Sequence, residues 1–237
     1  MNAVATPIFS VDELSDDEPS EPLPLRLRLT WPTQQIGTSA VIKRLMDIVL
    51  SALCLIMLSP ILLLIAVAIT IESGWPCLFT QQRLGFYGKP FILFKFRSMC
   101  KDAPKRLAEV LANNEVADGP TFKWRHDPRV TRVGRFLRRT SLDELPQLLN
   151  VLKGDLSLVG PRPPLESEVA SYEEWQLQRL CLKPGMTGLW QVSGRSKLTF
   201  KQMVELDIAY GESWSVWQDL VILARTPLAV GTGRGAY

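Results

Sequence analysis

Two adjacent carboxylates, Asp143 and Glu144, are the side chains of this sequence best suited to chemistry. Arginines stand on both sides of them, with Arg138 upstream and Arg162 downstream in a loop rich in Gly and Pro. Oxygen ligands suit Mg²⁺, which proteins commonly hold with one or two carboxylates together with substrate phosphates. The acids and arginines together predict a site for a phosphate, a divalent cation and a nucleophile, and the arginines favour ionised acids.

A purely structural explanation of the same acids stays open. The spacing Ser141-x-x-Glu144 matches a capping box, and acids in a first helical turn complement the helix dipole. Leucines at helical spacing follow, and Gly154 is a suitable end for that helix. Pro146 opposes a regular helix from Ser141 because proline removes an intrahelical hydrogen bond, so the helix begins nearer Glu144 or bends. A helix N-terminus at this point would also bind phosphate.

The element that must place this site is an uncharged run from Ile48 to Ile71. Its 24 residues exceed the ~20 that cross a bilayer as a helix, so a simple span is one interpretation. Ser59-Pro60 divides the run at its centre into two arms, each about 18 Å long at the rise of an α-helix. Basic residues flank both ends, and the positive-inside rule then favours the cytoplasmic side for both. We therefore expect a re-entrant helix pair, broken at Ser59 and Pro60.

Asp47 stands at the mouth of this run, one helical turn from Lys43 and Arg44. We expect a surface ion pair there, because residues three or four apart are neighbours on a helix. The alternative is that Asp47 pins the membrane helix to the rest of the protein.

The charge of the chain is divided unevenly. Residues 1–24 hold six acids and no Lys or Arg, which leaves 27 basic against 18 acidic residues in the remainder. Residues 1–40 lack sustained periodicity and are rich in Pro, Ser and acids, so we predict a disordered acidic tail. A basic body suits an anionic partner such as a membrane surface, a nucleotide or a phospholipid. We predict no nucleic-acid partner, because the sequence has no zinc-finger spacing and no RNA-binding signature.

Histidine and cysteine usage excludes other kinds of site. His126 is the single histidine, so a histidine-based metal cluster or catalytic triad is excluded. The four cysteines show no paired spacing, and we expect reduced, structural thiols.

The rest of the chain combines short strands with helices. Residues 79–99 predict a hairpin, with Phe91 to Phe96 as its clearest strand. We expect helices over residues 102–113, 166–182 and 200–228, and a Gly-rich loop from Gly185 to Arg195. The expected fold class is α+β, mostly helical: a membrane-associated catalytic domain with an N-terminal re-entrant membrane helix.

Four long motifs stand in the order found in one known family. They are Gln82-Arg-Leu-Gly-Phe-Tyr-Gly-Lys-Pro-Phe91, Lys95-Phe-Arg-Ser-Met99, Ser141-Leu-Asp-Glu-Leu-Pro-Gln-Leu-Leu-Asn-Val-Leu-Lys-Gly-Asp-Leu-Ser-Leu-Val-Gly-Pro-Arg-Pro163 and Lys183-Pro-Gly-Met-Thr-Gly-Leu-Trp-Gln-Val-Ser-Gly-Arg195, and Leu206-Asp207 follows them. From roughly Ile42 to the C-terminus the sequence resembles the bacterial sugar transferases. These are monotopic phosphoglycosyl transferases that begin glycan assembly on a polyprenyl phosphate carrier, anchored by a re-entrant helix.

The resemblance implies a reaction with a role for each site residue. Asp143 would attack the sugar-linked phosphorus of a UDP-sugar and expel UMP, while Glu144 would hold Mg²⁺. Polyprenyl phosphate, with undecaprenyl phosphate as the expected carrier, would then attack the phosphosugar-aspartyl intermediate. The substrate-binding residues implied are Arg138, Arg162, Arg195, Asp207 and Asp219. The two aspartates of that set serve either the surroundings of the metal or structural ion pairs.

Two rival explanations stay open. The first is the same transfer in a direct ternary complex, with Asp143 and Glu144 both on the metal and no covalent adduct. The second is a membrane-tethered scaffold, without catalysis, whose acids only cap a helix. The sugar cannot be identified from the residues, although Met186 to Trp190 and the ending Gly235-Ala-Tyr237 favour a hexose, glucose or galactose, over an N-acetylated sugar.

The resemblance also implies an organisation for the whole chain. We predict a tail over residues 1–40, a re-entrant helix hairpin over 41–73 and the transferase domain over 74–237, as in the small form of the family. The domain is expected on the cytoplasmic face of the bacterial inner membrane. Its expected partners are the inner leaflet, a UDP-sugar and polyprenyl phosphate, and formation of a homo-oligomer is left open.

Overall fold

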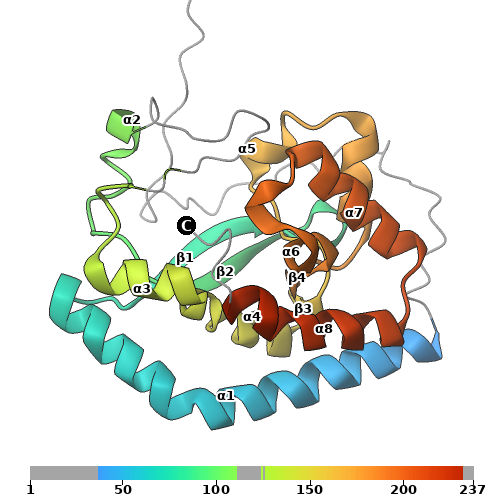
Figure 1. Ribbon diagram of the computed structural model, residues 1–237, viewed down its shortest axis with the longest axis horizontal. Helices are drawn as coiled ribbons and strands as arrows, with labels where there is room; N and C mark the ends of the chain where they lie inside the picture. The colour runs from blue at the N-terminus through green and yellow to red at the C-terminus, as the bar shows by residue number, and fades with distance from the viewer. Residues whose placement is uncertain (1–36, 111–123, 125, 232–237) are drawn as a thin grey trace, which may run out of the picture.

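The computed structural model of the chain describes residues 37–110, 124 and 126–231. The described part is α+β and mostly helical, as the sequence predicted. Figure 1 shows a body of short helices and two strand pairs that lies over one long helix, α1 (Thr38–Ser73). The predicted tail lies almost wholly outside the described residues, and its expected end at residue 40 was too late because α1 already begins at Thr38.

Helix α1 is continuous over 36 residues, with Pro60 inside it. The hydroxyl of Ser59 donates to the carbonyl of Ile56 (2.8 Å), the carbonyl that Pro60 leaves without its usual backbone donor. Figure 1 shows that α1 bends near its middle, away from the body, and that its two ends rise toward opposite sides of the body. The expected hairpin was wrong in this respect, since the two arms form one bent helix.

Apolar side chains cover the outside of α1. The exposed large ones are Val41, Ile42, Leu45, Ile48, Val49, Leu53, Ile56, Met57, Ile61, Leu63, Leu64, Val67 and Ile71. Contiguous apolar surface of this extent marks an interaction or membrane site in a folded protein. Within the described part of the chain, α1 is also the helix whose length and composition would allow it to enter a membrane.

Two strand pairs lie in the body. Strands β1 (Leu78–Leu84) and β2 (Pro90–Phe96) form the predicted antiparallel hairpin, joined by a 3₁₀ turn, η3 (Phe86–Gly88). Strands β3 (Ser157–Val159) and β4 (Gly185–Thr187) pair in parallel. The largest buried cluster joins β2 and β3 to the helices α4 (Gln147–Lys153), α7 (Phe200–Glu212) and α8 (Val216–Gly231). It contains Leu93, Leu148, Val151, Leu156, Leu158, Val159, Leu182, Tyr210, Trp214 and Ile222.

Several predicted elements are shorter or divided. The helix expected over 102–113 is only α2 (Leu107–Val110), with residues 111–113 outside the described part, and that over 200–228 is divided into α7 and α8. The helix expected over 166–182 is α5 (Glu166–Val169) followed by a 3₁₀ segment, η6 (Glu174–Cys181).

The segment from Gly185 to Arg195 is not a loop. It contains β4, α6 (Leu189–Ser193) and the start of a 3₁₀ turn, η7 (Arg195–Lys197). Backbone contact explains the difference, because a methyl group at Gly185 would lie 2.1 Å from the backbone nitrogen of Gly160. The glycine thus lets β4 pack directly on β3 and the residues that follow it.

Candidate active site

Asp143 and Glu144 lie on a 3₁₀ turn, η5 (Leu142–Glu144), between α3 (Arg132–Thr140) and α4. Ser141 ends α3 with a φ of 55°, a left-handed conformation that is uncommon for residues other than glycine. Its side chain caps nothing and Pro146 immediately precedes α4, so the expected capping box was wrong. The two acids therefore precede α4, which ends at Gly154 as predicted.

Glu144 is held by two cations. Its Oε1 atom accepts a hydrogen bond from Lys95 Nζ (2.8 Å) and one from Arg162 Nη1 (3.4 Å). Burial alone would raise the pKa of Glu144, but the charges of Lys95 and Arg162 outweigh it and lower that pKa to about 2. Glu144 is therefore ionised at neutral pH, and Arg162 lies beside the acidic pair as the sequence predicted.

The surroundings of Asp143 shift its pKa in the opposite direction. Burial, and then the charge of Glu144, raise the pKa of Asp143 above its usual value, while Lys95 and Arg138 oppose the rise. Arg138 acts on the pKa of Asp143 in the direction expected of an arginine, but burial and Glu144 outweigh it, so the expected ease of ionisation was wrong. Two neighbouring carboxylates with pKa values pushed apart indicate two different roles.

Arg138 and Arg195 approach the turn from different elements. Arg138, near the end of α3, donates from Nε to the hydroxyl of Ser98 (2.9 Å), and its own pKa is lowered by burial against the opposing charge of Asp143. Arg195 donates from Nη1 to the carbonyl of Ala229 (2.9 Å) and from Nη2 to the hydroxyl of Ser141 (3.3 Å). Both arginines thus border the turn that carries Asp143.

Two cations of the hairpin were missed as site residues in the sequence. Lys95 on β2 binds Glu144, and buried Arg83 on β1 donates to the carbonyl of Pro163 (3.2 Å) beside Arg162. Burial first, and then Arg162, lower the pKa of Arg83 to about 10. A signal was present in the sequence, since Lys95 stands between two phenylalanines in an apolar strand, where a charge needs a buried partner.

A small pocket lies beside the acidic pair. It is lined by Arg83, Leu93, Lys95, Glu144, Gln147, Arg162, Pro163, Gly185 and Met186. Three of these side chains are cationic and one is the ionised Glu144, so the lining has an excess of positive charge that attracts anions.

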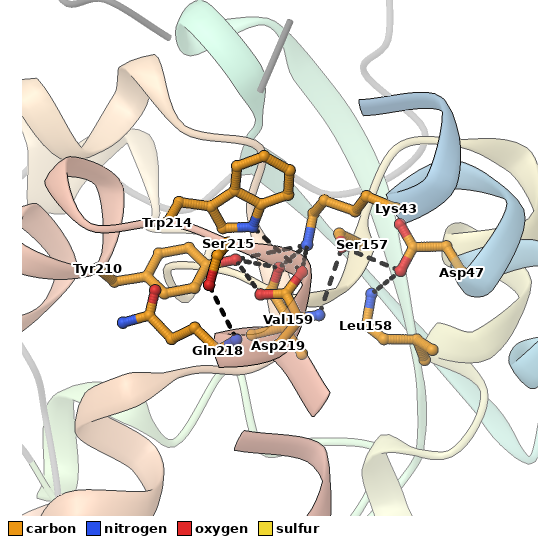
Figure 2. A network of polar contacts seen from close by, with 10 residues as sticks. All are labelled: Lys43, Asp47, Ser157, Leu158, Val159, Tyr210, Trp214, Ser215, Gln218 and Asp219. Carbon is orange, nitrogen blue, oxygen red and sulfur yellow. Dashed lines mark hydrogen bonds and ion pairs between the residues drawn. The ribbon is translucent and has the colours of Figure 1, made fainter. Parts of the chain in front are cut away.

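Asp207 and Asp219 lie in buried ion pairs rather than in this pocket. Asp207 pairs with Arg179 (2.6 Å), and burial raises the pKa of Asp207 to about 6 despite that arginine. Asp219 pairs with Lys43 (2.5 Å) and also accepts from Tyr210 (2.7 Å) and Trp214 (3.2 Å), as Figure 2 shows. Their placement supports the structural alternative and not the substrate-binding one.

Asp47 is also buried, so the expected surface pair was wrong. Its Oδ1 atom accepts from the hydroxyl of Ser157 (3.0 Å) and from the backbone N–H of Leu158 (2.9 Å) (Figure 2). The neighbouring Arg44 donates to the carbonyls of Val151 (2.6 Å) and Leu152 (2.8 Å), at the end of α4. The first turns of α1 therefore pin this helix to the body, as the alternative for Asp47 predicted.

The residues around Glu144 fit a magnesium ion that is completed by substrate. Within the described residues no group of three or more His, Cys, Asp or Glu side chains gathers into a complete protein cage. Lys95 and Arg162 both contact Glu144 through Oε1, and Asp143 adds a second carboxylate next to it. Such a sparse set of oxygens suits Mg²⁺, which usually keeps waters and binds substrate phosphates.

Comparison with known proteins shows that the sequence is similar to bacterial enzymes that transfer sugar phosphates. A family model described as bacterial sugar transferase matches residues 38–233. The undecaprenyl-phosphate galactose phosphotransferase of Salmonella typhimurium is 46% identical over 203 residues, which is 84% of this chain and 42% of that protein. The UDP-glucose:undecaprenyl-phosphate glucose-1-phosphate transferase of Escherichia coli is 40% identical over 215 residues, 87% of this chain and 44% of that protein.

A third relative has a length similar to that of this chain. The exopolysaccharide production protein ExoY of Rhizobium meliloti is 40% identical over 211 residues, which is 88% of this chain and 92% of that protein. The chain thus spans less than half the length of the first two relatives but nearly all of ExoY. Since the family model extends from α1 to the end of α8 and includes the acidic pair, the chain belongs to the bacterial sugar transferase family.

Proposed function

We propose that this protein transfers a sugar-1-phosphate from a UDP-sugar to polyprenyl phosphate and releases UMP. The observation that carries the proposal is the pair Asp143 and Glu144, with raised and lowered pKa values, on one turn among Lys95, Arg138 and Arg162. Relatives named as undecaprenyl-phosphate galactose and glucose-1-phosphate transferases support this reaction, and the same names favour a hexose as the sugar. The names of the ExoY relatives support a role in exopolysaccharide production.

The first half-reaction is a displacement at phosphorus. A carboxylate oxygen of Asp143 attacks the sugar-linked phosphorus, the phosphoanhydride bond breaks, and UMP leaves with the electron pair. The raised pKa of Asp143 makes its ionised carboxylate the stronger base of the acidic pair, which suits the nucleophile. Covalent capture divides a difficult transfer between two large substrates into two simpler displacements.

The neighbouring cations bind and orient the diphosphate. Arg162 lines the pocket with part of its side chain exposed, so its planar guanidinium can meet phosphate oxygens in pairs. Lys95 keeps Glu144 ionised and in place. Mg²⁺ held by Glu144, with Asp143 adjacent, would offset the charge of the substrate phosphates.

The second half-reaction transfers the phosphosugar from Asp143 to the lipid carrier. A phosphate oxygen of the polyprenyl carrier attacks the same phosphorus and displaces Asp143, which forms polyprenyl-diphospho-sugar and regenerates the carboxylate. The bent, apolar α1 beneath the body supports a re-entrant helix that holds the site at the plane of the lipid phosphates. Basic flanks on both sides of α1 support the cytoplasmic face for that site.

The experiment that tests this function is a transfer assay with the full chain in lipid nanodiscs. Undecaprenyl phosphate, Mg²⁺ and radiolabelled UDP-glucose or UDP-galactose are supplied, and the organic phase is analysed for a labelled lipid. The proposal predicts a lipid-linked sugar and an equal amount of UMP. A chain that produces neither product from any UDP-sugar in a broader panel, while remaining folded, would favour the membrane-tethered scaffold.

A further inference from the structure

Each end of α1 forms hydrogen bonds with an element that leads to an arginine of the site. The C-terminal end contacts α3, which carries Arg138, and the N-terminal part contacts β3, which precedes Arg162. At the C-terminal end, Glu72 accepts two hydrogen bonds from α3, one from the N–H of Arg132 to Oε1 (2.8 Å) and one from the N–H of Val133 to Oε2 (3.0 Å). The first amides of a helix have no partner within that helix. The Thr131 hydroxyl accepts from the N–H of Gly134 (2.9 Å), and Glu72 accepts from the two amides before it, so Thr131 and α1 together cap α3.

Helix α3 carries this contact to Arg138. Arg138 stands six residues after Arg132, a distance of about 9 Å along a helix. The helix lies directly on Ser98, because a methyl group at Gly134 would come within 2.0 Å of the Ser98 carbonyl oxygen. The N–H of Thr131 donates to that carbonyl (3.1 Å), and Arg138 donates to the Ser98 hydroxyl (2.9 Å). The short helix α3 therefore connects the capping contact of Glu72 directly to Arg138.

The N-terminal part of α1 is likewise hydrogen-bonded to β3 (Figure 2). Asp47 accepts from Ser157 and from the N–H of Leu158, while Lys43 donates to the carbonyl of Val159 (2.9 Å). Together these contacts occupy each residue of the strand.

Strand β3 leads directly to Arg162 through Gly160 and Pro161. The connection has little freedom, since a methyl group at Gly160 would lie 2.2 Å from the carbonyl oxygen of Lys183. The carbonyl of Arg162 is fixed by Arg179 (3.3 Å), and its guanidinium reaches Glu144 (3.4 Å). A displacement of the first turns of α1 is thereby passed on to this arginine.

We propose that Glu72 and Asp47 are positioning residues, which set Arg138 and Arg162 on the two sides of the acidic pair through α3 and β3. Because α1 is one continuous helix that makes both sets of contacts, the bend that it adopts in the membrane sets the spacing of the two arginines. Insertion of the helix into the bilayer is thereby coupled to formation of the site. The inference rests on the proposed function, because it assigns these arginines to the diphosphate.

Glu72 offers the cleaner test because its side chain is at the surface, so its replacement leaves no buried group unpaired. The full chain in nanodiscs is compared as wild type, Glu72→Ala, Glu72→Asp and Glu205→Ala. Glu205 is the matched control, an exposed glutamate on α7 with only a loose contact to Lys201 (4.0 Å). Hydrogen exchange of residues 132–144 and the initial rate of UMP release against UDP-sugar concentration are measured on each.

For Glu72→Ala we expect amide exchange about fivefold faster from Arg132 through Arg138. We also expect kcat/KM for the UDP-sugar to fall by about tenfold or more, through a misplaced arginine. Glu72→Asp restores part of both, Glu205→Ala changes neither, and all variants bind nanodiscs equally. Asp47→Asn, which keeps an acceptor oxygen in the buried site, should lower kcat/KM and speed exchange over residues 157–162.

Exchange that rises only at Arg132 and Val133, with wild-type kinetics, would overturn the proposal and leave Glu72 as a local cap. A failure of the proposed function gives a different result in this experiment, because the wild type itself would then release no UMP. The exchange measurement still decides in that case: a change that spreads to Arg138 supports the coupling, and a change confined to the first turn contradicts it.

Discussion

Arg195 donates a hydrogen bond to the hydroxyl of Ser141 (3.3 Å), and both residues hold a left-handed backbone, with φ of 54° and 55°. Neither is a glycine, so each conformation is strained. Ser141 stands two residues before Asp143, at the point where α3 ends and η5 begins. The bond thus joins the Gly-rich C-terminal motif to the turn that carries Asp143.

The strain at Ser141 predicts an order of stability among its variants. Ser141→Ala loses the bond to Arg195 and keeps the strain, whereas Ser141→Gly loses both. The glycine variant should therefore be more stable than the alanine variant by about 1 kcal/mol. Thermal melts of both in one detergent check this, and an alanine variant at least as stable as the glycine variant would refute the strain.

Lys95 should be essential for activity. Lys95→Met removes the cation nearest to Glu144 and leaves Arg162 as the remaining cation in contact with this half-buried carboxylate among the described residues. We expect kcat to fall by about 10²- to 10³-fold, as when a preorganised charged donor is deleted from an active site. The control is Lys201→Met on α7, whose side chain is largely exposed. Transfer activity of Lys95→Met within twofold of wild type would show that the pair is only structural.

Glu144 should govern the response to magnesium. Chelation with EDTA abolishes UMP release, and added Mg²⁺ restores it in the wild type. In Glu144→Gln the Mg²⁺ concentration for half-maximal rate should rise by about tenfold or more, since a ligand charge is lost. An equal rise in Glu205→Gln, or none in Glu144→Gln, would assign the metal to other groups.

Asp219 should matter for stability and not for substrate affinity. Asp219→Asn leaves Lys43 with no charged partner in a buried site, which costs about 3–5 kcal/mol of unfolding free energy. Below its melting temperature the variant should retain the wild-type KM for the UDP-sugar. A wild-type melting temperature with a raised KM would instead restore the substrate-binding role first expected of Asp219.

Local sequence signals predicted the local structure well. Gly154 ends α4 and the predicted strand Phe91 to Phe96 lies in β2 of the hairpin, because each feature depends on a few neighbouring residues. Residue types and spacing also pointed to Arg138 and Arg162, and the structure places both close to the acidic pair.

Long-range partners could not be found in the same way. Lys43 and Asp219 are 176 positions apart, and Lys95 and Glu144 are 49 apart, so no local pattern joins them. The burial that raises the pKa of Asp143 also arises only when the hairpin, α3 and α4 meet. The expected loop from Gly185 to Arg195 was wrong for a similar reason, since the contact of Gly185 with Gly160 depends on two segments that are distant in the sequence.

The central claim is that Asp143 becomes covalently linked to the phosphosugar. The most direct test is intact-protein mass spectrometry of the detergent-solubilised chain with Mg²⁺ and single UDP-sugars, without lipid phosphate, for wild type and Asp143→Asn. The account predicts a mass gain of one phosphosugar in the wild type, its absence in the variant, and its loss when polyprenyl phosphate is added. A wild type that never gains mass, yet releases UMP once polyprenyl phosphate is present, would contradict the covalent step and favour direct transfer.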